Sequence, residues 1–344
     1  MYDKAVVVQD GIIKNISSFD PDNTKADYIG HYLVPSFIDL QIYGNGGKLF
    51  SMYPTPETLQ TMYDHCSEVG TGQFLVTIAT NTNEVMFSAI EAVKNYWESD
   101  GKGLIGLHLE GPWINPLKRG AHIEAFVKTP QIEDLLPVLE YGRGVIKMIT
   151  LAPEVCNDDV LKLIESFDII ISAGHSNATH AEATASFSKG ITTVTHLFNA
   201  MSPFHHRDPG LPGAAFGHDA VMSSIIVDGH HVDFSAVAIA KRLMGERLFL
   251  ITDAVTETKE GPYQHTYRDG RYLSANTLSG SALTMLDAVK NCVAHCGIKA
   301  EEALRMASLY PAKLMNIQGG TIRLNEKASF VLLDENLKVL TTCL

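Results

Sequence analysis

The chain has 344 residues, of which 45% are hydrophobic and 19% charged, and its formal net charge is −12 at pH 7. A chain of this length and composition can bury a large core, as one large α/β barrel or as two ordinary domains. An acidic surface repels phosphate backbones and anionic lipids, which argues against nucleic acid and membranes as partners.

The N-terminal segment MYDKAVVVQDG lacks the basic region and apolar run of a signal peptide. No stretch approaches the ~20 apolar residues that span a bilayer. The chain has five cysteines and no CxxC motif, a pattern typical of reduced thiols. Cys292 and Cys296 lie on one predicted helix, where two buried thiols are favoured over a metal clip. We therefore expect a soluble, cytoplasmic protein.

The two ends of the chain carry short strand patterns. Residues 5–16 place Asp10-Gly11 between two β-branched runs, which is a hairpin signal. The segments TIRLNEKASFVLL and NLKVL near the other end also resemble strands. Neither end is long enough to form a domain alone. We therefore predict that residues 1–34 and 318–344 pair into one small β-sandwich domain.

Between the ends, short apolar runs alternate with amphipathic helical segments, as in parallel βα units. Eight such runs fit a (β/α)8 TIM-type barrel over residues 35–317. The predicted strands are 37–44, 73–80, 104–111, 145–153, 168–175, 192–200, 222–231 and 247–254. The predicted helices are 56–69, 84–99, 130–140, 158–166, 179–189, 233–244 and 281–296.

Polar, ligand-type residues appear where these predicted strands end. In a TIM-type barrel the carboxyl ends of all strands meet at one mouth, which carries the active site. One polar residue at a strand end is common, whereas several together favour a shared site. The residues are Gln41, Glu110, His175, His196, the cluster Asp228–His231 and Asp253.

Glu110, His175 and His196 supply one carboxylate and two imidazoles from the third, fifth and sixth predicted strands. Three protein ligands leave a position open for water, which is typical of a catalytic metal site. Nitrogen and oxygen ligands suit Zn²⁺, and Fe²⁺, Mn²⁺ or Co²⁺ fit the same donors. The sequence thus predicts a metal ion that activates water for attack on a carbonyl carbon.

Hydrolysis of an amide also needs proton transfer to the leaving nitrogen. Asp253, at the end of the eighth predicted strand, is placed to act as general base and then general acid, with helix capping as the alternative. His108 shares a strand face with Glu110 and is a candidate partner of the metal ligands. His122 is a candidate for polarising the substrate carbonyl, with an exposed loop histidine as the alternative.

Taken together, these motifs resemble the N-acetylglucosamine-6-phosphate deacetylases of the amidohydrolase superfamily. The segments VPSFIDLQIYG, HLEGPWINPLKRGAH, SAGHS, THLFNAM, VDGHHVD, LITDA and LSGSALTM follow the order of that family, and THLFNAM followed by RDPGLPG is especially specific. The resemblance implies deacetylation of the sugar phosphate by a homodimer. It assigns Glu110, His175 and His196 to one metal ion and Asp253 to acid-base catalysis.

The resemblance also implies a set of substrate contacts. His122 would contact the acetamido carbonyl, and Asn199, Ala200, Arg207 and His231 would bind the sugar phosphate. The basic run from His205 to Arg207 agrees with a phosphate site, because arginine pairs with phosphate oxygens in a bidentate manner, with a solvated loop as the alternative. Arg207 acts either within its own chain or from the neighbouring subunit.

The chain departs from the family pattern at four positions. Gln41 and Tyr43 replace the His-x-His pair that much of the superfamily uses for a second metal ion, so we predict one divalent ion per chain. Ser36 and Ser329 stand where the family usually has Gly and Asp, and they concern structure more than chemistry.

Three alternative functions are also considered for this sequence. Amidohydrolases such as dihydroorotases bridge two metals with a carboxylated lysine at the end of the fourth strand, but Lys147 lies near that strand's beginning. A deacetylase for the epimeric N-acetylgalactosamine-6-phosphate stays open, because epimer choice depends on a few hydrogen bonds. A noncatalytic barrel would lack a ligand or the acid, and all are present here.

Overall fold

The computed structural model describes residues 4–20, 22 and 25–344. Eight parallel strands form a central sheet in the order β13-β12-β11-β10-β9-β8-β7-β4. Backbone hydrogen bonds of 2.9 Å, from the Tyr43 amide to the Ala254 carbonyl and from the Asp253 amide to the Gln41 carbonyl, join its two edges into a barrel. The predicted (β/α)8 architecture is confirmed. The strands are β4 (Phe37–Ile42), β7 (Thr71–Ala79), β8 (Leu104–Glu110), β9 (Ile146–Leu151), β10 (Ile170–Ala173), β11 (Ile191–Val194), β12 (Met222–Ile225) and β13 (Leu248–Leu250).

The barrel strands are buried on both faces, because the interior packs on one side and the helices on the other. Every residue of β4 and of β13 is buried. This explains why the strands appear in the sequence as nearly continuous apolar runs. Several end earlier than predicted; β11 stops at Val194 and β12 at Ile225, and the chain beyond them turns into the loops that carry the candidate site residues.

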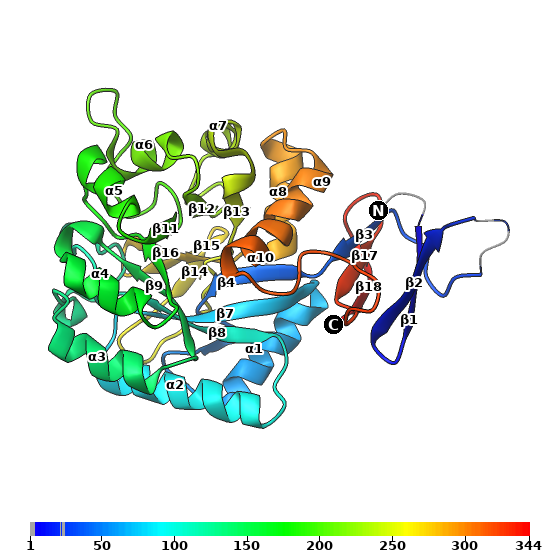
Figure 1. Cartoon of the computed structure of the whole chain (residues 1–344), viewed down its shortest axis with the longest axis horizontal. Helices are drawn as coiled ribbons and strands as arrows, with labels where there is room; N and C mark the ends of the chain where they lie inside the picture. Colours follow the sequence, from blue (N-terminus) through cyan, green and yellow to red (C-terminus); the bar gives the residue numbers. More distant parts are fainter. Residues whose placement is uncertain (1–3, 21, 23–24) are drawn as a thin grey trace.

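Helices surround the barrel on its outer side (Figure 1). Their starts follow from local chemistry: the Thr55 hydroxyl accepts a hydrogen bond from the Thr58 amide at the start of α1, and Thr179 and Glu182 form a capping box at the start of α5. All seven predicted helices are present. They are α1 (Pro56–Glu68), α2 (Asn83–Glu98), α3 (Ile132–Tyr141), α4 (Asp158–Glu165), α5 (His180–Phe187), α7 (Phe234–Met244) and α8 (Met285–His295).

Further elements were not predicted. The helix α6 (Gly210–Gly217) contains three glycines and a proline, which disfavour helix in isolation, and it is held by burial of Leu211, Ala214 and Ala215. A three-stranded antiparallel sheet follows the eighth barrel strand. These elements are α6, α9 (Ala300–Met306), α10 (Leu309–Met315), β5 (Gly44–Asn45), β6 (Lys48–Leu49), β14 (Thr266–Arg268), β15 (Arg271–Ser274) and β16 (Thr277–Ser281).

Strands from the two ends of the chain lie side by side next to the barrel (Figure 1). The predicted hairpin is present as β1 (Lys4–Gln9) and β2 (Ile12–Ser18), and both residues of its Asp10-Gly11 turn have positive φ. A second sheet has the order β18-β17-β3, with β3 (Tyr32–Pro35), β17 (Phe330–Leu333) and β18 (Val339–Cys343). Hydrogen bonds connect the hairpin to residues 325–328.

The pairing of the chain ends agrees with a small β-domain. Its boundaries at 1–34 and 318–344 are our proposal, and residues 1–3, 21 and 23–24 of the first range lie outside the described residues. Within the described residues, no helix is both long and apolar enough to cross a bilayer.

Ser36 and Ser329, the two positions that depart structurally from the family pattern, contact each other. Their hydroxyl groups are 2.7 Å apart, and the Ser36 amide donates to the Ser329 carbonyl at 3.1 Å. Ser36 lies between β3 and β4, so this contact links the terminal sheet to the first barrel strand.

Candidate active site

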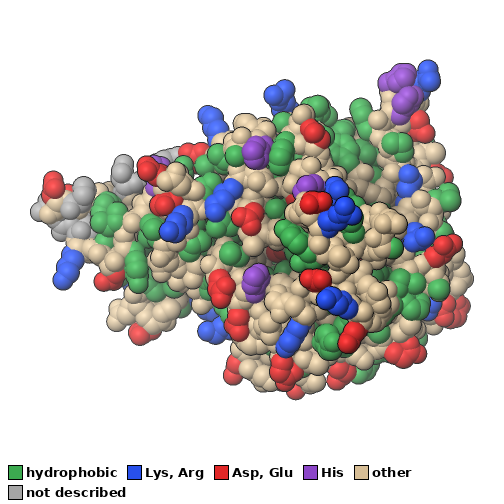
Figure 2. Space-filling model, turned by 180° about the vertical axis from the view of Figure 1, so that it is seen from behind, with side chains coloured by type: hydrophobic (Ala, Val, Ile, Leu, Met, Phe, Trp, Pro, Cys, Tyr) green, Lys and Arg blue, Asp and Glu red, His purple; other side chains and the backbone are tan. Residues whose placement is uncertain are grey.

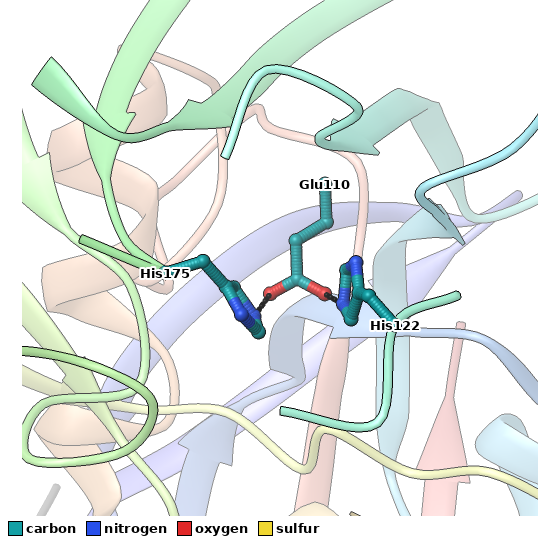
Figure 3. A group of neighbouring side chains, drawn as sticks. All are labelled: Glu110, His122 and His175. Atoms are coloured by element: carbon teal, nitrogen blue, oxygen red, sulfur yellow. Dashed lines mark hydrogen bonds and ion pairs between the residues drawn. The ribbon is translucent and has the colours of Figure 1, made fainter. Parts of the chain in front are cut away.

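Glu110, at the carboxyl end of β8, lies at the centre of a cluster of buried side chains at the barrel mouth. Its Oε1 is 3.3 Å from His175 Nε2 and 2.9 Å from His196 Nε2, and its Oε2 is 3.0 Å from His122 Nε2. Figure 3 shows His122 and His175 on opposite sides of the carboxylate. The structure thus brings together the three predicted metal ligands and His122.

The hydrogen-bond partners of His175 indicate which of its nitrogens can bind a cation. Its Nδ1 is 2.9 Å from the Lys118 carbonyl, which only accepts hydrogen bonds, so the hydrogen lies on Nδ1. The lone pair of Nε2 then points toward Glu110 Oε1 and toward His196 Nε2, 3.1 Å away. A lone pair facing a carboxylate suits an intervening cation, so the donor set fits a metal ion.

His122 has the opposite hydrogen arrangement. The backbone amide of Thr80 donates to its Nδ1 at 3.3 Å, which places the ring hydrogen on Nε2, facing the site. Burial, together with the neighbouring His175, lowers the pKa of His122 to about 4, so the ring is neutral. Although Glu110, His122 and His175 are close enough to share an ion, this tautomer makes His122 a hydrogen-bond donor rather than a ligand.

Gln41 and Tyr43, which replace the His-x-His pair, form a hydrogen-bonded bridge. Gln41 Nε2 lies 2.9 Å from Glu110 Oε1, 2.7 Å from Asp253 Oδ1 and 2.7 Å from the Tyr43 hydroxyl. The Tyr43 hydroxyl donates to Glu110 Oε2. An amide nitrogen thus lies between two carboxylates, where it separates their charges through hydrogen bonds.

Asp253 is buried beside this bridge. Desolvation by burial raises its pKa well above the ordinary value, and the negative charges of Glu110, Asp39 and Asp228 act in the same direction. Glu110 behaves differently: burial opposes its charge, but the histidines around it, above all His175, hold its pKa well below the usual range. The two neighbouring carboxyl groups therefore differ in proton affinity.

Several of these residues adopt the left-handed backbone conformation. The φ angle is 49° at His175, 36° at His196, 46° at Ala200 and 54° at Asp253. Such angles are unfavourable for residues with a side chain, and they concentrate at functional sites. His175, His196 and Asp253 lie two or three residues beyond the ends of β10, β11 and β13, where the chain enters the loops of the mouth.

A cavity of about 270 Å³ opens over the cluster. Asn199, Ala200 and His231, which the family resemblance assigns to the substrate, line the cavity together with Asp253, Glu110 and the three histidines around Glu110. Arg207 does not line this cavity and is exposed. Its loop, between β11 and α6, protrudes beyond the helices in Figure 1, and Figure 2 shows histidine and basic side chains on a protrusion at the same end of the molecule.

Other sequence-based candidates lie away from the chemistry. His108 bonds to the Leu40 carbonyl and to the Thr150 hydroxyl and not to a metal ligand. Lys147 lies at the start of β9, at the opposite end of the strand from the mouth, so a carboxylated-lysine bridge does not fit. Cys292 and Cys296 are both buried, as favoured from the sequence.

One wall of the cavity was not predicted from the sequence. Tyr263, His265 and Ser279, from the segment around β14 to β16, line the cavity. The segment has little apolar periodicity, but Asp269-Gly270 at the β14–β15 turn is the same hairpin signal as Asp10-Gly11 and could have revealed it.

Comparison with known proteins agrees with this geometry. The model of the amidohydrolase family matches residues 32–343. The N-acetylglucosamine-6-phosphate deacetylase of Haemophilus influenzae is 33% identical, covering 99% of this chain and 93% of its own length. The N-acetylgalactosamine-6-phosphate deacetylase of a Shewanella species is 34% identical, covering 98% and 89%. The crystal structure of N-acetylglucosamine-6-phosphate deacetylase from Pasteurella multocida is similar with a TM-score of 0.93 and 33% identity, covering 99% of this chain and 93% of that one. The chain therefore belongs to the amidohydrolase family.

Proposed function

We propose that the protein hydrolyses the acetamide of N-acetylglucosamine-6-phosphate to glucosamine-6-phosphate and acetate. The observation that carries this proposal is the convergence of Glu110, His175, His196, Asp253 and His122 in one cavity. The similarity over nearly the whole chain to deacetylases of amino-sugar phosphates supports the choice of substrate.

Glu110, His175 and His196 would hold one divalent metal ion, with Zn²⁺ the best match to this donor set. A cation held there supplies Lewis-acid chemistry, because it lowers the pKa of water and polarises a carbonyl group. A second ion would lack ligands, since Gln41 Nε2 lies where the carboxylates of Glu110 and Asp253 approach each other. We therefore propose one ion per chain.

Two side chains would transfer the proton and polarise the carbonyl group of the substrate. His122 would turn its Nε2 hydrogen from Glu110 Oε2, 3.0 Å away, to the acetamido oxygen, and its tautomer supports this role because the Thr80 amide occupies Nδ1. Asp253 accepts a proton from the attacking water and passes it to the leaving nitrogen. Its raised pKa favours proton uptake, and Gln41 holds its Oδ1 by a hydrogen bond of 2.7 Å. The amine leaves only once it is protonated.

Asn199, the backbone of Ala200 and His231 would bind the sugar phosphate. Among the described residues that line the cavity, none is a lysine or an arginine, although a phosphate group needs positive charge. We therefore propose that Arg207 completes the site from the neighbouring subunit of a homodimer. Its exposure on a protruding loop is consistent with contact to a second copy.

The test measures free amine released from N-acetylglucosamine-6-phosphate, from its galacto epimer and from unphosphorylated N-acetylglucosamine. Each is measured before chelation, after chelation and after Zn²⁺ is restored. We expect release from the gluco phosphate that is lost on chelation and recovered with Zn²⁺. Preference for the galacto epimer would support the second candidate function, which similarity to the Shewanella enzyme favours. Activity on the unphosphorylated sugar alone would refute the phosphate site.

A further inference from the structure

Glu154 connects three loops at the mouth of the barrel. It lies in the short helical turn η3 (Pro153–Val155), which follows β9. Its Oε1 accepts hydrogen bonds from Asn115 Nδ2 at 2.8 Å and from the Asn177 amide at 2.5 Å, and its Oε2 accepts one from the Ser176 hydroxyl at 2.7 Å. Glu154 does not line the cavity, so it has no direct contact with the proposed substrate or ion.

Two of these three donors follow directly after His175 in the chain. His175 has a φ angle of 49°, which is unfavourable for a residue with a side chain and persists only where the surrounding structure holds it. Ser176 and Asn177 donate to different oxygens of the Glu154 carboxylate. The Ser176 hydroxyl also accepts a hydrogen bond from the Ala178 amide at 3.1 Å. Glu154 therefore fixes the direction of the chain as it leaves His175.

The third donor, Asn115, belongs to the turn that holds the ring of His175. The Asn115 amide donates to the His175 carbonyl at 2.9 Å, and the Lys118 carbonyl accepts from His175 Nδ1 at 2.9 Å. A hydrogen bond of 2.8 Å from the Lys118 amide to the Asn115 carbonyl fixes the turn between them. Glu154 is thus connected to the ring of His175 through Asn115 and Lys118.

Hydrogen bonds rather than apolar burial hold this turn in place. Pro116 and Leu117 are exposed, Leu117 by 80%, and Asn115 and Lys118 are only partly buried. A turn without an apolar anchor depends on the polar groups that bind it. The position of the Lys118 carbonyl therefore depends on the hydrogen bond from Asn115 to Glu154.

We infer that Glu154 is a positioning residue of the metal site and holds His175 in the orientation that lets its Nε2 bind the ion. This inference rests on the proposed function, because His175 is there one of the three metal ligands. Groups that orient a metal ligand typically change metal affinity about 10- to 100-fold when they are lost. Glu154 acts through the hydrogen bonds at the backbone and the ring of His175, not by contact with the ion.

The test measures the Zn²⁺ affinity of the metal-free protein, by competition against a chelator of known affinity, together with its melting temperature. Glu154→Leu removes all three hydrogen bonds at a similar side-chain volume. Glu154→Gln keeps one oxygen as an acceptor, and its amide group can donate to the Ser176 hydroxyl. Glu182→Leu is the matched control, because Glu182 also accepts hydrogen bonds, from the amide and the hydroxyl of Thr179 at 2.8 Å each, but caps α5.

We expect Glu154→Leu to lower the Zn²⁺ affinity about 10- to 100-fold and Glu154→Gln to stay closer to the wild type. Glu182→Leu should lower the melting temperature and leave the Zn²⁺ affinity unchanged. Wild-type affinity in Glu154→Leu, or an equal loss of affinity in Glu182→Leu, would overturn the inference. If Glu154→Leu does not fold, Asn115→Ala takes its place, and wild-type affinity in that variant would overturn the inference.

Failure of the inference and failure of the proposed function give different results, because the Zn²⁺ affinity is measured without substrate. A wild type that binds Zn²⁺ with the same affinity as Glu154→Leu contradicts the inference alone. A wild type whose Zn²⁺ affinity depends on Glu154, but which releases no amine from either sugar phosphate, supports the inference and refutes the proposed reaction.

Discussion

Replacement of Tyr43 by phenylalanine removes the hydroxyl group that connects Gln41 to Glu110. In the wild type this hydroxyl donates to Glu110 Oε2 and accepts from Gln41 Nε2 at 2.7 Å. Without it, Oε2 retains only the contact with His122 at 3.0 Å. The Glu110 carboxylate can then rotate more freely, and its buried charge loses one of its hydrogen-bond donors.

The size of the expected effect depends on how deeply Tyr43 and Glu110 are buried. Tyr43 is 7% and Glu110 1% exposed, so water does not replace the lost hydrogen bond. A hydrogen bond to a charged group contributes about 1.5–3 kcal/mol. For a chain of this length the unfolding entropy is about 0.7 kcal/mol/K, so the melting temperature of the metal-free protein should fall by about 2–4 °C. Because partners of metal ligands orient them, metal affinity should fall about 10- to 100-fold.

The assay combines thermal melting of the metal-free protein with competition for Zn²⁺ against a chelator of known affinity. Tyr53→Phe is the control, because Tyr53 is 45% exposed and lies away from the cluster. The melting temperature and the Zn²⁺ affinity should both fall in Tyr43→Phe, and neither should change in Tyr53→Phe. A Tyr43→Phe protein with wild-type metal affinity and wild-type melting temperature would refute the idea that this hydroxyl holds Glu110 in place.

Three further predictions concern the acid-base residue, the metal content and the pH dependence of stability. Asp253→Asn should keep its metal ion and lose turnover by about two to four orders of magnitude, measured as amine release alongside elemental analysis; a near-normal rate would remove Asp253 from proton transfer. Elemental analysis of the wild type should find one metal ion per chain, and two would contradict the roles given to Gln41 and Tyr43. Burial raises the pKa of Asp39 to about 6, above its ordinary value of 3.8, despite hydrogen bonds from Thr252. The folded state therefore binds this proton more tightly, and the stabilisation is present below pH ~4 and lost as pH rises through ~6. Relative to Asp39→Asn, the metal-free wild type should lose about 2–2.5 kcal/mol of unfolding free energy between pH 4 and pH 7, measured by urea titration, and a constant difference would contradict this reasoning.

The order of strands and helices in the barrel could be predicted because the patterns that mark each element lie within a short stretch of the sequence. Continuous apolar runs mark strands buried on both faces, and capping residues such as Thr55 and Thr179 mark where helices begin. Parallel strands then bring their carboxyl ends together, so Glu110 and His175, 65 positions apart in the chain, were expected at one mouth before any distance was known.

Elements without local periodicity could not be predicted in the same way. Helix α6 contains glycine and proline and is stabilised by burial of Leu211 and its neighbours, not by its own propensity. The segment around β14 to β16 is mostly exposed, so its sequence gives little sign that Tyr263 and His265 line the cavity. Such elements depend on packing against residues distant in the chain.

The sequence by itself determined the fold class, the family resemblance and the residue types that meet at the barrel mouth. Only the tertiary structure decided how those residues are used: the Thr80 amide fixes the tautomer of His122, and Gln41 bridges two carboxylates. The physical reason is that hydrogen position, charge and burial depend on contacts between segments that are far apart in the chain, whereas periodicity and capping depend on neighbours within a few residues.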